Sequence, residues 1–135
     1  MSQNKKPKTV AELIADARTR IESLTPEQVA AEMERGALLI DLRETEERTE
    51  HGCIPGAVHA PRGMLEFWAD PTSQFHRAEF DPSRRIIVHC AAGGRSSLAA
   101  DTLQQMGYTR VAHMDGGFER WAKEGCPVEG GHAAP

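Results

Sequence analysis

The sequence of 135 residues has no long apolar run and few aromatic residues, with Phe, Trp and Tyr making up 5% of the chain. No apolar stretch approaches the length that a membrane-spanning helix requires. The basic opening segment is not followed by the apolar core of a signal peptide. We therefore expect a cytoplasmic protein that does not bind membranes.

The sequence is also poor in cysteine. Cys53, Cys90 and Cys126 are odd in number and widely spaced, which fits neither a disulfide framework nor a zinc site built on a C-x-x-C pair. The six histidines contain no pair at the i, i+4 spacing of a metal-binding helix. We expect free thiols, no metal site and no cofactor.

Basic residues are fewer than acidic ones, at 16 against 20, which gives a net charge of -4. Three of the lysines, Lys5, Lys6 and Lys8, fall in the first eight residues, so the rest of the chain has 13 basic against 20 acidic residues, or -7. Nucleic acids and anionic membranes are bound mainly through Lys and Arg near phosphates. The charge balance therefore argues against a nucleic-acid partner.

Hydrophobic periodicity divides the chain into a short tail, an extension and one domain. Residues 1–8 are predicted to be a disordered basic tail, and residues 131–135 a disordered C-terminus. A helix is predicted over about 9–23, because five apolar residues share one helical face: Val10, Leu13, Ile14, Ala17 and Ile21. We thus expect an N-terminal helical extension over 9–24 and a domain over 25–130.

The domain alternates strands and helices without repeats. Thr25-Pro26-Glu27-Gln28 has the pattern of a helix start, and Gly36 ends that helix. The apolar runs 37–42 and 85–90 predict strands buried on both faces, followed later by a short strand over 111–114 and a helix over 118–122. The segment 61–83 is irregular and is predicted to form short helices over the sheet. This order indicates an α/β domain with a mainly parallel sheet, whose site lies at the carboxyl ends of the strands.

The most informative segment is a buried strand that ends in Cys90, followed by a turn rich in Ala and Gly and by a helix that begins near residues 94–96. This order places the thiol above a helix N-terminus, among backbone N–H groups without helical acceptors. The helix dipole and Arg95 both favour the thiolate, so Cys90 is a candidate nucleophile. Gly93 and Gly94 allow the backbone to approach an anion or a persulfide closely.

Four motifs resemble, in order and spacing, those of the rhodanese-like sulfurtransferase domain, over about residues 25–128. They are Asp41-Leu42-Arg43-Glu44, Ile54-Pro55-Gly56-Ala57, His89-Cys90-Ala91-Ala92-Gly93-Gly94-Arg95-Ser96, and Asp115-Gly116-Gly117-Phe118 with Trp121. The resemblance implies a rhodanese-like α/β fold with a five-stranded, mainly parallel sheet flanked by helices, here with an extra N-terminal helix. It also implies sulfur transfer through a persulfide on a loop cysteine.

Carried over to this sequence, the resemblance makes Cys90 the sulfur carrier. The substrate-binding residues would be Ala91, Ala92, Gly93, Gly94, Arg95 and Ser96, with Arg95 binding an anionic donor such as thiosulfate. Asp41 and Arg43 would brace the active loop through hydrogen bonds or an ion pair. The acceptor would be a thiol or cyanide, and a protein donor or acceptor is a further possibility.

Other residues have simpler structural interpretations. Ser96 and Ser97 are expected to cap the helix that follows the loop, although they could also hydrogen-bond a persulfide. Glu44 and Glu47 are expected on a solvated helix face, and His89 in the core. Cys53 departs from the family pattern, which has a histidine at this position, and could act as a second thiol near Cys90.

Two other functions remain open from the sequence. Cysteine-dependent phosphatases use the same thiolate and arginine in a related fold, but with a loop of five residues between them, whereas residues 91–94 make four here. A sulfur-carrier or regulatory binding module is the second alternative, although such modules generally lose the cysteine. The apolar face of the N-terminal helix must pack on the domain or on a second copy, which makes a homodimer possible.

Overall fold

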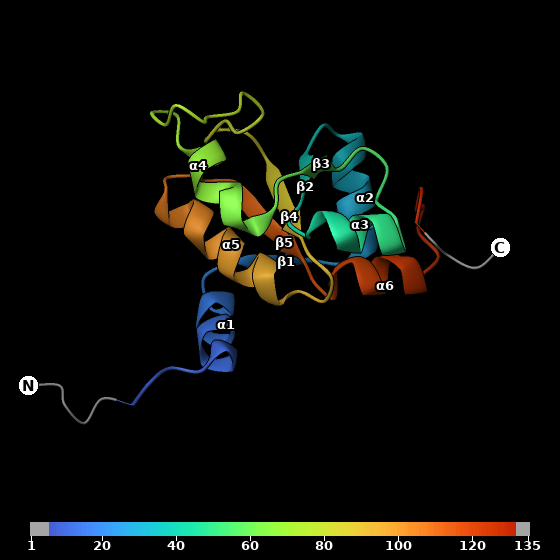
Figure 1. The fold of residues 1–135 in the computed structure, drawn as a ribbon, viewed down its shortest axis with the longest axis horizontal. Helices are drawn as coiled ribbons and strands as arrows, with labels where there is room; N and C mark the ends of the chain where they lie inside the picture. Colours follow the sequence, from blue (N-terminus) through green and yellow to red (C-terminus); the bar gives the residue numbers. More distant parts are fainter. Residues whose placement is uncertain (1–5, 132–135) are drawn as a thin grey trace, which may run out of the picture.

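The computed structural model describes residues 6–131, and at its centre lies a sheet of five parallel strands. The strands lie in the order β1-β5-β4-β2-β3 (Figure 1). Their bounds are β1 Glu22–Leu24, β2 Leu38–Asp41, β3 Val58–His59, β4 Ile86–His89 and β5 Val111–Met114. Both β2 and β4 are buried along their whole length, as their apolar runs predict. The expected α/β fold with a five-stranded parallel sheet is confirmed.

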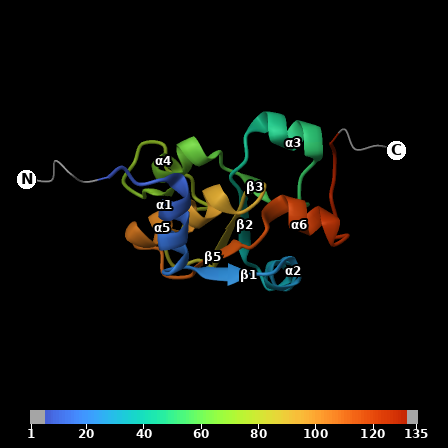
Figure 2. The ribbon, with the colours of Figure 1, turned by 90° about the horizontal axis from the view of Figure 1, so that it is seen from below.

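Helices cover both faces of this sheet, as the view in Figure 2 shows. Their bounds are α1 Val10–Arg18, α2 Pro26–Glu34, α3 Thr45–His51, α4 Leu65–Ala69, α5 Gly94–Gln105 and α6 Gly117–Lys123, with a 3-10 turn η1 Arg62–Met64. Within residues 6–131, no helix is both long and apolar enough to cross a membrane.

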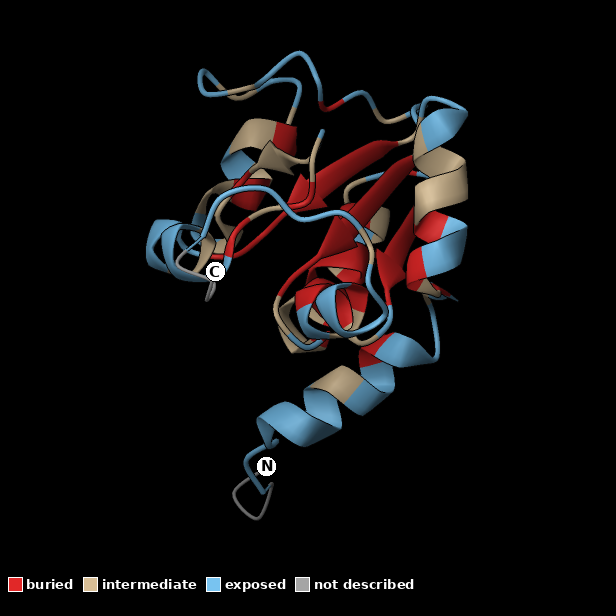
Figure 3. Ribbon diagram, turned by 90° about the vertical axis from the view of Figure 1, so that its right-hand side faces the viewer, coloured by how far each residue is buried: buried red, intermediate tan, exposed pale blue. Residues whose placement is uncertain are grey.

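Alternate residues of the central strands point to two apolar layers. Ile40 and Val88 lie in the layer that α4 and α5 cover, whereas Leu39 and Ile87 lie in the layer that α2 and α6 cover. Figure 3 shows the strands buried between these helices, while α1 is largely exposed. The buried sheet fixes the carboxyl ends of β2 and β4 side by side, in register at Asp41 and His89.

The helix predicted over 9–23 is too long, because α1 ends at Arg18 and the chain then enters the sheet. Glu22–Leu24 forms β1, an edge strand that pairs with β5 from Glu22↔Ala112 to Leu24↔Met114. Ile21 packs against the core instead of continuing the helical face. Hydrogen bonding to the sheet thus overrides the helical periodicity, and the predicted extension over 9–24 contains a strand of the domain.

The short helices predicted in the irregular segment are present, whereas one short strand was not expected. In the irregular segment, short helices form over 62–69, but no helix or strand follows until β4. The short strand β3 was not expected, because its two residues carry no apolar run. The predictions for residues 1–5 and 132–135 lie outside the described residues.

Candidate active site

The Cys90 loop connects the end of β4 to the start of α5. Gly93 is the N-cap of α5 and has φ +112°, a left-handed conformation that favours glycine. The backbone N–H of Gly93 lies 3.2 Å from Cys90 Sγ, and that of Ser96 lies 3.4 Å from it. The sulfur therefore lies among the N–H groups that a helix N-terminus leaves without helical acceptors, as the sequence predicts.

The start of α6 holds the loop from the opposite side. The carbonyl oxygens of Cys90 and Ala91 accept hydrogen bonds from the backbone N–H groups of Phe118 and Glu119, at 2.8 and 3.0 Å. This close approach requires a glycine before them, since a Cβ on Gly117 would lie 2.6 Å from the Ala91 carbonyl. The Asp115-Gly116-Gly117 turn is therefore the support of the active loop.

The two serines after the loop do not cap α5. The hydroxyls of Ser96 and Ser97 instead donate back to the carbonyl oxygen of Gly93, at 3.2 and 2.6 Å. Gly93 is itself the N-cap, so its carbonyl lies within reach of both hydroxyls. The expectation of a serine cap is therefore wrong, and the two side chains fix the turn at Gly93.

A buried histidine on the strand next to β4 supports Ser96. His113 on β5 has its Nδ1 3.0 Å from Ser96 Oγ and its Nε2 2.9 Å from Ser23 Oγ. Burial lowers the pKa of His113, so the ring is a neutral hydrogen-bonding partner. No motif in the sequence indicates this residue, because it reaches the loop only through the pairing of β1, β5 and β4.

Arg95 is engaged by a carboxylate. Its guanidinium donates to both carboxylate oxygens of Glu47 on α3, at 2.7 and 2.8 Å. These hydrogen bonds lower the pKa of Glu47 to about 2. Glu47 lies on a partly exposed helix, as predicted, but its side chain also contacts the active loop and offsets the charge of Arg95.

Asp41 and Arg43 form an ion pair that is almost fully buried. The Arg43 guanidinium donates to Asp41 Oδ1 and Oδ2, at 3.0 and 2.9 Å, and to the carbonyl oxygen of Gly52, at 2.8 Å. Arg48 also donates to Asp41 Oδ2 at 3.1 Å. Burial raises the pKa of Asp41, but the hydrogen bonds from Arg43 and the neighbouring charges together outweigh burial and bring this pKa to about 2.

Hydrogen bonds from this pair to the active loop were expected, but the pair makes none. Its partners are Gly52 and Arg48, and the Arg43 guanidinium also stacks over Phe118, 4.1 Å from the ring centroid. The backbone N–H of Phe118 donates to the carbonyl oxygen of Cys90, so the pair supports the loop indirectly, through Phe118. The two residues act through α3 and α6 rather than on residues 90–96.

The structure also shows the surroundings of His89 and Cys53. His89 is fully buried beside Asp41, and burial lowers its pKa to about 4, so it is a neutral core residue, as expected. The backbone of Cys53 pairs with Glu129, and its side chain lines neither of the two cavities next to the loop. Its role as a second thiol stays a prediction.

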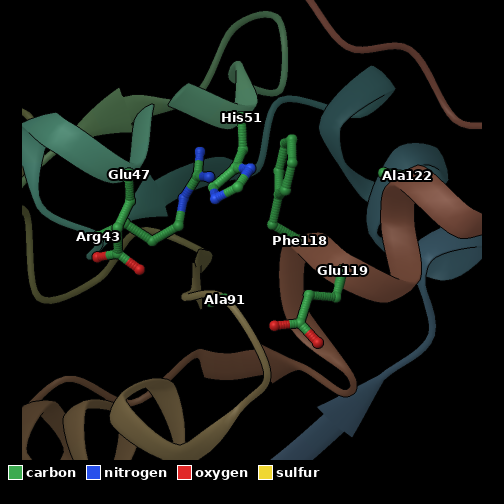
Figure 4. Close-up of a pocket in the computed structure, with 7 residues that line it drawn as sticks. All are labelled: Arg43, Glu47, His51, Ala91, Phe118, Glu119 and Ala122. Atoms are coloured by element: carbon green, nitrogen blue, oxygen red, sulfur yellow. The ribbon is translucent and has the colours of Figure 1, made fainter. Parts of the chain in front are cut away.

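Two cavities flank the loop. The larger, of about 480 Å³, is lined by Ala91 but not by Cys90. Figure 4 shows the side chains of Arg43, His51 and Phe118 close together on one side of it. The second cavity, of about 310 Å³, is lined by Cys90 and the loop residues after it, by Arg95, and by apolar side chains of α1 and α5.

The second cavity is therefore the approach to the sulfur. No aspartate or glutamate lines it, so it contains no carboxylic acid that could protonate an alkoxide leaving group. The N–H groups at Cys90 can stabilise a thiolate or a persulfide. This arrangement suits a nucleophilic sulfur that accepts and releases another sulfur atom.

Comparison with known proteins gives a consistent family assignment. A model of the Rhodanese-like domain matches residues 25–124. The thiosulfate sulfurtransferase GlpE of Pseudomonas syringae is 34% identical over 103 residues, covering 76% of this chain and 89% of that protein. A sulfurtransferase of Allochromatium vinosum is 32% identical over 91 residues, or 67% of this chain and 77% of that one.

A solved structure from Rhodopseudomonas palustris has a similar fold. Its TM-score is 0.84 at 37% sequence identity, with 92% of this chain and 99% of that chain covered. That protein is described as one of unknown function and as a possible tyrosine phosphatase.

Proposed function

The chain belongs to the family of rhodanese-like domains, and we propose that it moves a sulfane sulfur from an anionic donor such as thiosulfate to a thiol or cyanide through a persulfide on Cys90. The observation that carries this proposal is the position of Cys90 Sγ, within 3.2 and 3.4 Å of two backbone N–H groups at the bottom of an open cavity. Relatives named as sulfurtransferases support it.

In the first half-reaction, the Cys90 thiolate attacks the outer sulfur of thiosulfate. A bond forms between Cys90 Sγ and that sulfur, the sulfur–sulfur bond of thiosulfate breaks, and sulfite leaves with the bonding electron pair. The N–H groups of Gly93 and Ser96 stabilise the negative sulfur throughout, because they are fixed by the start of α5.

In the second half-reaction, a thiolate or cyanide attacks the outer sulfur of the persulfide. The bond to Cys90 Sγ breaks, and Cys90 leaves as the thiolate, ready for another donor. No general acid is needed, since both the attacking and the leaving sulfur are anionic. The neutral, buried His89 and the cavity without carboxylic acids are consistent with this requirement.

The phosphatase alternative has less support than sulfur transfer, first because of the contacts of Arg95. A phosphatase of this type needs the loop arginine to clamp the phosphoryl oxygens, but here its guanidinium is bound by both oxygens of Glu47. The loop also has only four residues, 91–94, between the cysteine and the arginine. A smaller cradle suits a single sulfur atom better than a tetrahedral phosphate.

The proposal is tested by mixing the protein with thiosulfate and measuring its intact mass. We expect a gain of one sulfur atom on Cys90, which cyanide removes as thiocyanate. Cys90→Ser should abolish both steps, while Cys126→Ser, at a half-buried thiol that lines neither cavity, should retain them. Turnover of an aryl phosphate without any sulfur transfer would instead establish the phosphatase.

A further inference from the structure

Helix α1 lies outside the residues that match the family, yet it forms a wall of the Cys90 cavity. Figures 1 and 2 show it beside α5. A capping box between Thr9 and Glu12 fixes its start. After its end, Arg20 donates to both carboxylate oxygens of Asp101 on α5, at 2.9 and 2.8 Å. The C-terminal end of the helix is therefore tied to α5.

Helix α1 contacts the first turn of α5 directly, from its middle and from its last residue. Arg18 donates to the hydroxyl of Ser97 at 3.1 Å, and Ile14 lies so close to Gly94 that a Cβ on this glycine would be 3.2 Å from Ile14 Cδ1. The loop and α1 thus pack as one unit. From the sequence, the apolar face of α1 could pack on the domain or on a second copy. In the structure, part of this face packs on the domain.

The cavity wall opposite the loop is apolar. Val10, Ile14 and Leu98 line it, and Val10 is 64% exposed at its rim. The Val10 side chain buries little surface, so it contributes little to the core, yet it lines the same cavity as the Cys90 thiol. Contact with a bound molecule would bury that surface and make binding more favourable.

The charges around this cavity suit a sulfur acceptor whose only anionic group is its sulfur. Arg95 is the cation that lines the cavity, and its charge is offset by Glu47. The N–H groups that could bind an anion are directed at Cys90 Sγ itself. The site therefore matches a ligand with an anionic sulfur at one end and an apolar body at the other.

We infer that the cavity between α1 and the loop binds the sulfur acceptor, and that this acceptor is a small thiol with an apolar substituent. Its sulfur would lie at Cys90, with the substituent against Val10, Ile14 and Leu98. The inference rests on the proposed function. The bound thiol loses its proton to solvent, its thiolate attacks the outer sulfur of the Cys90 persulfide, a new persulfide forms on the acceptor, and Cys90 leaves as the thiolate.

The test uses the full chain, loaded with sulfur from thiosulfate and mixed with single acceptors. Ethanethiol, propanethiol and butanethiol share the same nucleophile, so only the apolar body varies. Because burying a methylene is worth about 0.8 kcal/mol, each added methylene should raise the transfer rate constant about two- to fourfold. Mercaptopropanol, with a hydroxyl in place of the terminal methyl group of butanethiol, should react more slowly than butanethiol.

Two substitutions on α1 provide the matched comparison. Val10→Gln places a polar group in the cavity wall and should reduce the increase in the transfer rate constant per added methylene. Leu13→Gln changes an exposed leucine that does not line the cavity and should leave this increase unchanged. Leu13→Gln should load sulfur and discharge it to cyanide like the wild type. For Val10→Gln, the comparison uses the ratios of its rates with the three thiols, so that a general change in loading cancels. Equal rates for all thiols, or equal effects of the two substitutions, would overturn the inference.

Two other results are distinguishable. If the wild type fails to load sulfur from thiosulfate or to discharge it to cyanide, the proposed function itself is wrong. If light scattering shows a dimer that Val10→Gln dissociates, while the preference among thiols stays the same, then a second copy of the chain covers this face. That result would replace the acceptor with a homodimer interface.

Discussion

Arg95 and Glu47 are joined by two hydrogen bonds of 2.7 and 2.8 Å, although 48 residues separate them in the sequence. The contact links the active loop to α3 and places a carboxylate beside the cation that was expected to bind the sulfur donor. Both side chains are about one-third exposed, so an anionic donor can reach them. The donor must then share Arg95 with the Glu47 carboxylate or displace that carboxylate from Arg95.

Substitution of Glu47 tests this competition. Glu47→Gln removes the negative charge and frees Arg95, so kcat/KM for thiosulfate should rise about three- to tenfold, as expected for about 1 kcal/mol at a part-exposed pair. Glu46→Gln, at an exposed neighbour on α3, should have little effect. Salt screens such charges, so moderate salt should increase the wild-type rate more than that of Glu47→Gln. A lower rate in Glu47→Gln would show instead that Glu47 positions Arg95 for catalysis.

The buried pair of Asp41 and Arg43 predicts a large effect on stability. Arg43→Met leaves the Asp41 carboxylate buried without its main partner and should lower the free energy of unfolding by about 3–5 kcal/mol. Arg48→Met removes a second, partly exposed donor to the same oxygen and should cost about 1 kcal/mol or less. Urea denaturation at neutral pH measures both values. Equal losses in the two variants would contradict this assignment.

His89 predicts a loss of stability in mild acid. Burial holds its pKa at about 4, below the ordinary value of 6.5. Between pH 6.5 and about 4 the unfolded chain binds a proton that the folded chain does not, so stability falls as the pH falls through this range, by up to about 3 kcal/mol. His113, also buried with a lowered pKa, contributes in the same direction.

The measurement is a series of urea titrations between pH 7 and pH 4. His89→Leu, which cannot bind this proton, should show a smaller change in the unfolding midpoint across the range, while the exposed His51→Gln should behave like the wild type. Asp41 does not confuse the comparison, because its pKa is lowered to about 2 and its contribution is lost only at more acidic pH. An unchanged pH profile in His89→Leu would refute the prediction.

Gly117 predicts a loss of activity through displacement of the active loop. Gly117→Ala would place a Cβ 2.6 Å from the Ala91 carbonyl and push the active loop away from α6. We expect persulfide formation to slow by at least about tenfold, as a small misplacement of reacting groups produces. Gly125→Ala is the control, because that glycine also has a positive φ, +81°, but no atom lies within 4 Å of its Cβ position. Similar rates in the two variants would show that the contact is not needed.

The sequence by itself predicted the elements whose signals are local. The apolar runs of β2 and β4, the capping box at Thr25 and the thiol above the start of α5 follow from periodicity and helix-end chemistry. The motifs around Cys90 were specific enough to indicate the family. These features need only neighbours in the chain, and for that reason a single sequence reveals them.

The tertiary structure decided which distant residues meet the active loop. Glu47 reaches Arg95, His113 reaches Ser96, and Val10 reaches the Cys90 cavity only because the sheet brings α3, β5 and α1 to one end of the molecule. The turn of residues 20–24 into β1 likewise depends on pairing with β5. Contacts of this kind depend on which elements pack together, and that packing is set by burial of the whole core rather than by any local pattern.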